Sequence, residues 1–200
     1  MGVDPNKIRL TGENSFLRIG EATDGEHTAE NSHWRVYLSP KGMGHALFSK
    51  CVLSGNKPRI YADNIALARW LQEGIMASMR DTYSGEEIPI VEAEFSKSGD
   101  SSTCWSEYVE SRNELICLSW YDFMAPVVVA NRPFENPDQP HGLYSVLVPA
   151  RRAQMTVNGE AVVGRALPGD FWGREGSSCA LALSESWTIP PEHEWAADAL

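Results

Sequence analysis

The chain has 200 residues, of which 42% are apolar, and a formal net charge of −10. This apolar content excludes a disordered chain. The acidic balance argues against partners such as nucleic acids or anionic membrane surfaces, which require clustered Lys and Arg. The sequence contains no apolar run of the length that a membrane-spanning helix needs. Its N-terminus has no apolar signal core, so we expect a cytoplasmic protein.

Residues 1–32 are polar and rich in Gly, Asn, Glu and Thr, and we expect them to be partly irregular, with one short strand at 15–19. We expect the same irregularity at 190–200. No repeat or shift in composition marks a boundary, so we predict a single domain over 1–200. Three strands with alternating apolar residues are predicted next, at 33–38, 45–53 and 59–62.

A long amphipathic helix is predicted over 64–80, where the apolar period changes from two to about 3.6. Asp63 is the expected N-cap, because a short acceptor side chain there satisfies the first free amides of a helix. The apolar face must pack against a sheet. It is formed by Ile65, Ala68, Leu71, Ile75 and Met79.

Residues 103–123 form the stretch around which we expect the fold to be built. Two alternating runs flank a turn at Arg112 and Asn113, which predicts a β-hairpin. Side chains alternate between the two faces of a strand. We therefore expect one mostly apolar face made of Trp105, Glu107, Val109, Ile116, Leu118 and Trp120, with Asp122 at its end.

The remaining sequence also predicts strands joined by turns and loops. A β-branched strand at 125–130 precedes a loop with three prolines at 131–141, a candidate lid. Asn158-Gly159 predicts a tight hairpin that pairs Met155 with Val162. We expect the other elements to be strands at 88–96, 143–148 and 178–187 and a glycine-rich loop at 167–177.

These elements predict a mainly β fold with a minor α component. About 8 to 10 strands favour an antiparallel barrel or a strongly bent sheet, with the helix covering one face or one end. In architecture alone this is similar to the calycin-like ligand-binding barrels. The Gly-x-Trp signature of lipocalins is missing, because Gly20 is followed by Glu21 and Ala22.

Glu107 is the first catalytic candidate, because it stands between Trp105 and Val109 on the apolar face. If this face points inward, the carboxylate loses water and its pKa rises, so it exchanges protons near neutral pH. If the face points to solvent, or if an Arg pairs the acid, Glu107 is structural. The sequence leaves both alternatives open.

Three further catalytic candidates are Asp122, Glu185 and His141. The two acids stand beside aromatic residues on predicted strands, and the histidine ends the proline-rich loop. Aromatic rings often line pockets for flat or cyclic organic ligands, although they also fill cores. The candidate ligand-binding residues are Trp105, Trp120, Tyr108, Tyr121, Arg35 and Trp172.

No motif for a nucleotide, a phosphate or a metal is present, and the four cysteines form no Cys-x-x-Cys pair. We therefore expect neither cofactor nor metal. The sequence favours a cofactor-independent lyase, isomerase, hydratase or cyclase that acts on a hydrophobic or aromatic small molecule by carboxylate acid–base chemistry. The alternative is a binding protein for such a ligand. A third reading is an aromatic face that packs on a partner chain, including a homodimer.

Overall fold

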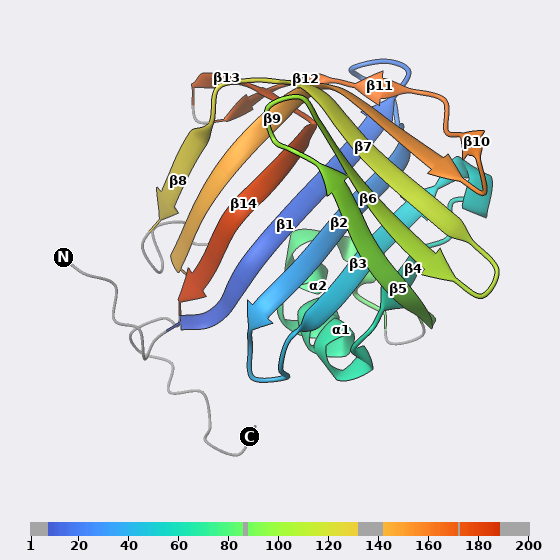
Figure 1. Cartoon of the computed structure of the whole chain (residues 1–200), viewed down its shortest axis with the longest axis vertical. Coiled ribbons are helices and arrows are strands. Elements are labelled where there is room, and N and C mark those ends of the chain that lie inside the picture. The colour runs from blue at the N-terminus through green and yellow to red at the C-terminus, as the bar shows by residue number, and fades with distance from the viewer. Residues whose placement is uncertain (1–7, 86–87, 132–141, 172, 189–200) are drawn as a thin grey trace.

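The computed structural model describes residues 8–85, 88–131, 142–171 and 173–188 (Figure 1). It is mainly β, with 64% strand and a closed barrel of nine strands. Around the barrel the order is β9, β14, β1, β2, β3, β4, β5, β6 and β7, and the pairing of β7 with β9 closes it. Of the two predicted architectures, the barrel is therefore correct.

The strands are β1 Ile8–Gly20, β2 His27–Leu38, β3 Gly44–Cys51, β4 Arg59–Ala62, β5 Ile90–Gly99, β6 Cys104–Ser111, β7 Leu115–Phe123, β8 Val127–Asn131, β9 Gly142–Val157, β10 Glu160–Ala161, β11 Arg165–Ala166, β12 Pro168–Phe171, β13 Arg174–Ser177 and β14 Cys179–Thr188. The helical segments are η2 Val52–Ser54, α1 Ile65–Leu71, the π-turn η3 Gln72–Met76, α2 Ala77–Met79 and η4 Asp81–Tyr83. Of the strands outside the barrel, β8 and β10 each pair with β9, and β11 pairs with β1. The strands β12 and β13 pair with each other.

The predicted hairpins have the expected registers. In the β6–β7 hairpin Trp105 pairs with Trp120 and Glu107 with Leu118. The second hairpin turns at Asn158, and its register is set by the bond from the amide of Val162 to the carbonyl of Met155. Turn chemistry and period-two alternation were sufficient to predict these pairings.

The N-terminal region is more regular than its polar composition predicts. Residues 8–20 form the whole of β1, and β2 begins within the polar stretch, at His27. Leu17 and Ile19 of β1 are buried in the barrel, whereas Glu13 faces polar partners at its mouth. Because one end of this strand lies against charged groups, its sequence alternates less clearly than a strand over an apolar core.

One pair of barrel strands is parallel, which corrects the expectation of an entirely antiparallel sheet. β4 and β5 pair in parallel, and the helical segment lies between them in sequence. Parallel neighbours require such a crossover connection. The helical stretch covers 15 residues rather than the predicted 64–80, and a π-turn interrupts it. Its N-cap is Asn64, whose side chain accepts from the amide of Leu67, and not Asp63.

The two largest of three apolar clusters lie on the two sides of the barrel wall. The helices lie against the outside of β2, β3 and β4 (Figure 1), where Leu67 and Leu71 join Phe48 and Ile60 in one cluster. The other cluster fills the interior. It includes Leu17, Leu47, Tyr61, Val109, Leu118, Trp120, Met155 and Leu181. In the described part of the chain, no helix is both long and apolar enough to span a membrane.

Candidate functional site

The apolar face of the β6–β7 hairpin points into the barrel and brings Glu107 to a buried position with 1% exposure. Its Oε1 accepts hydrogen bonds from the Ser15 hydroxyl at 2.7 Å and from the Trp105 indole at 2.8 Å. Its Oε2 lies 2.7 Å from Nδ1 of His33. Three elements, β1, β2 and β6, therefore supply partners to one carboxylate.

The pKa of Glu107 is lowered, which corrects the expectation that burial would raise it. Burial favours the neutral acid and is the largest single influence. The charge of His33 and the hydrogen bonds from His33, Ser15 and Trp105 together outweigh it. Glu107 is thus ionised near neutral pH. Because a carboxylate only accepts hydrogen bonds, Nδ1 of His33 carries a proton.

A second histidine–carboxylate pair stands at the start of β3. Asp63, the residue after β4, accepts the amide of His45 through Oδ1 at 2.6 Å and lies 2.6 Å from Nδ1 of His45 through Oδ2. Asn64 holds the preceding turn by donating to the carbonyls of Lys41 and Met43. The helix N-terminus and the β2–β3 turn therefore fix the orientation of this imidazole.

The two pairs adjoin under the ring of Phe95. Its centroid lies 5.1 Å from that of His33 and 4.9 Å from that of His45, and the two imidazole centroids are 5.7 Å apart. Burial lowers the pKa of His45, and the nearby charges of His33 and Arg35 act in the same direction, whereas Asp63 opposes them. Nε2 of His33 is buried without a hydrogen-bond partner among the described residues.

Arg35, a candidate ligand-binding residue, lies beside this site. Its guanidinium forms an ion pair with Glu13, and a second nitrogen lies 3.9 Å from Oε1 of Glu107. Tyr37 donates to Glu13 at 2.9 Å. Glu13, Arg35 and Tyr37 thus form a hydrogen-bonded group beside Glu107. Among the described residues, no group of three or more His, Cys, Asp or Glu side chains is arranged to hold a metal.

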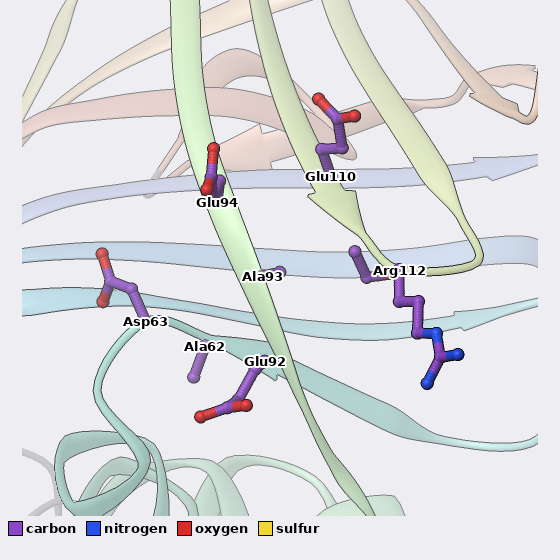
Figure 2. A pocket seen from close by; sticks show the side chains of 8 residues that line it. Ala62, Asp63, Glu92, Ala93, Glu94, Glu110 and Arg112 are labelled. Carbon is purple, nitrogen blue, oxygen red and sulfur yellow. The ribbon is translucent and has the colours of Figure 1, made fainter.

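A cavity of about 750 Å³ opens beside these residues. Arg35, Tyr37, His45 and Asp63 are part of its lining. A second cavity, of about 520 Å³, shares Asp63 and Glu92 with the first (Figure 2). Trp105 and Trp120, expected to line an internal pocket, instead pack in the interior cluster. The accessible space next to the site therefore lies at the mouth of the barrel.

Two predicted acids lie away from Glu107. Asp122 has a positive φ of 53° and an exposed side chain with an Arg151 guanidinium at 3.8 Å, so it does not continue the inner face. Glu185 is buried and contacts Asn14, the neighbour of Ser15 on β1. Since consecutive residues of a strand face opposite sides, Glu185 and Glu107 lie on opposite sides of β1.

Tyr108 and Tyr121 are on the outer face of the hairpin, because they alternate with Glu107 and Trp120. They do not join the site. His141 and Trp172 lie outside the described residues. From the sequence we expected Arg35 at a site but not His33, His45 or Asp63, the last of which we expected to cap the helix. The feature of the sequence that could have revealed His45 is the short turn between β2 and β3, because this turn pairs Arg35 with His45.

Gly44 is the backbone position that lets Asp63 approach His45. Its φ is +153°, and a Cβ there would lie 2.7 Å from Oδ1 of Asp63 and 2.8 Å from Cβ of Asn64. We expect Gly44→Ala to lower the free energy of unfolding by about 1–3 kcal/mol. Urea unfolding measures this. Gly74→Ala is the control, because no atom lies within 4 Å of its Cβ position; equal stability of both variants would contradict the prediction.

No family model, curated protein or solved structure matches this chain.

Proposed function

We propose that this protein is a small-molecule enzyme that moves a proton with the His45–Asp63 pair at the mouth of the barrel. The observation that carries the proposal is the placement of His45. His45 lines a cavity of about 750 Å³, and Asp63 occupies Nδ1 of its ring, so Nε2 is the nitrogen that can face a substrate. A histidine oriented by a carboxylate is a general base or acid of common design.

The surroundings of His45 are sufficient to make it a base at neutral pH. Because the pKa of His45 is lowered, the imidazole is neutral at pH 7 and accepts a proton from a substrate. Asp63 then stabilises the imidazolium, and Arg35 stands where negative charge on the substrate can be stabilised. Return of this proton to another atom of the substrate completes an isomerase or cyclase reaction. Its transfer to a leaving group completes a lyase reaction, and with water as the leaving group this is the reverse of a hydratase reaction; none of these needs an external cofactor.

Glu107 has a different role in this proposal from the one expected. It contacts His33 rather than the cavity, and His33 stacks with Phe95, on which His45 also stacks. We assign Glu107 and His33 as positioning residues that hold Phe95 and, through it, the ring of His45. This revises the expected carboxylate chemistry to histidine–carboxylate chemistry, and moves it from an internal pocket to the barrel mouth.

A binding protein without turnover is the second candidate. The observation in its favour is that Glu13 holds both Arg35 and Tyr37, so that these groups form a fixed rim that can orient a ligand. The proposed similarity to calycin-like ligand-binding barrels is consistent with this second candidate, but it concerns the architecture alone. A hydrophobic or aromatic ligand, a cytoplasmic location and a homodimer also stay predictions.

The ring opening of 5-nitrobenzisoxazole tests the proposal, because a single proton abstraction from carbon releases a coloured product. We expect the wild-type protein to accelerate this reaction and His45→Asn to reduce the acceleration about 100-fold or more. A base acts when deprotonated, so the rate should rise with pH. Because the pKa of His45 is lowered from 6.5, the rate should reach half its maximum below pH 6.5.

The matched control is His27→Asn, which changes a partly exposed histidine near Glu30 on the same strand as His33. It should leave the rate unchanged. Equal rates in wild type and His45→Asn would overturn the enzyme proposal. So would an equal loss in His27→Asn.

A further inference from the structure

Three large apolar side chains are exposed around the cavity at the mouth. Met43 is 70% exposed, and Tyr37 and Ile65 are each 49% exposed. All three line the same cavity as His45. They come from the end of β2, the β2–β3 turn and the first position of α1. A bound molecule with an apolar body would remove these surfaces from water, which is favourable in proportion to the area covered.

The second cavity, which adjoins the first, is lined by acidic residues. Asp63 and Glu92 line both cavities, and Glu94 and Glu110 line the second one. Glu94 and Glu110 stand directly opposite each other on β5 and β6, which is unfavourable for like charges. Among the described residues neither of them nor Glu92 has a cation within 4 Å.

Arg112 lines the second cavity, but it forms no ion pair with Glu92, Glu94 or Glu110 among the described residues. Figure 2 shows Arg112 at the β6–β7 turn, with its guanidinium on the opposite side of the group from the carboxylate of Asp63. The two cavities therefore present apolar side chains, together with Arg35, at one end, and at the other end the carboxylates of Glu92, Glu94 and Glu110, for which no ion pair is seen among the described residues. A ligand of complementary form has an apolar body and a positively charged group.

We propose that the two cavities form one groove that binds a small organic amine. Its apolar body covers Tyr37, Met43 and Ile65, and its ammonium group lies against Glu92 and Glu94. This inference deepens the proposed function, and rests on it, in taking this amine as the class of substrate presented to His45. The apolar contacts provide affinity, while the carboxylates select the charge of the ligand.

Isothermal titration calorimetry of the full chain at low salt tests the proposal with three probes. We expect 2-phenylethylammonium to bind at least 10-fold more tightly than 3-phenylpropanoate, which carries the opposite charge. It should also bind at least 10-fold more tightly than ethylammonium, which lacks the apolar ring. Added salt should weaken the binding, because the ammonium contacts are partly exposed.

Variants localise the binding to the groove. Glu92→Gln combined with Glu94→Gln should weaken the binding of 2-phenylethylammonium about 10-fold or more, and Met43→Ser about 5-fold. Glu160→Gln is the charge-matched control, since this exposed acid lies on β10 and is absent from the lining of both cavities. It should leave the affinity unchanged.

Two results would overturn the inference. One is binding of 3-phenylpropanoate as tight as that of the amine. The other is an equal loss of affinity in Glu160→Gln and in the double variant. The enzyme proposal is tested separately: selective amine binding without ring opening that depends on His45 would overturn only the enzyme proposal. Ring opening that depends on His45, without amine selectivity, would overturn only this inference.

Discussion

Replacing Glu107 with alanine is expected to lower the free energy of unfolding by about 3–5 kcal/mol, the usual cost of removing one partner of a buried ion pair. Ser15, His33 and Trp105 all direct donors at this carboxylate. The variant leaves these donors inside the barrel without an acceptor and leaves a cavity behind. No exposed acid of this chain should have a comparable effect.

Urea unfolding followed by tryptophan fluorescence measures the change. Glu107→Gln is the informative second variant, because its amide oxygen can still accept from Ser15 and Trp105. It should be destabilised less than Glu107→Ala. Glu160→Ala, on the exposed β10, is the control and should stay within about 0.5 kcal/mol of wild type. A loss below about 1 kcal/mol in Glu107→Ala would refute the role given to this network.

Glu185→Gln is expected to stabilise the protein by about 3 kcal/mol at pH 8 and by about 1 kcal/mol or less at pH 5. Burial raises the pKa of Glu185 to about 7, although bonds from Trp187, Ser145 and Asn14 partly oppose this effect. The folded state therefore holds a proton that the unfolded state, with an ordinary pKa near 4.5, has lost. Between these two values stability falls as pH rises, and above about pH 7 the full cost is present.

Glutamine removes the ionisation and keeps an acceptor for the Trp187 indole, which donates to Oε1 of Glu185 at 2.7 Å. The measurement is the free energy of unfolding of wild type and variant at pH 5 and pH 8. Other titrating groups contribute equally to both proteins, so the difference between them isolates Glu185. If wild type and variant differed in the free energy of unfolding by the same amount at both pH values, the pKa of Glu185 would not be raised.

The sequence was sufficient for features that depend on local pattern. The β6–β7 register follows from alternation around Arg112 and Asn113, and the second hairpin from Asn158-Gly159. The amphipathic period located the helix, and Ala68, Leu71 and Ile75 of its predicted apolar face pack on the sheet, whereas Ile65 and Met79 at its two ends are exposed. Each of these elements is determined by residues close together in the chain.

Features that depend on distant residues were missed. Glu107 was expected to have a raised pKa, but Ser15 and His33 come from strands far away in sequence and lower it. Asp63 and Asn64 are both good N-cap residues, and only the pairing of β3 with β4 shows that Asp63 binds His45 instead. No local pattern could reveal these contacts.

The pH dependence of 5-nitrobenzisoxazole ring opening, compared with an NMR titration of the His45 ring, tests the central claim most directly. We predict that the two midpoints coincide below pH 6.5, because the pKa of His45 is lowered. In Asp63→Asn both should move lower still, since Asp63 raises this pKa. A kinetic midpoint that differs from the titration of His45, or that stays fixed in Asp63→Asn, would contradict a proton transfer by this histidine.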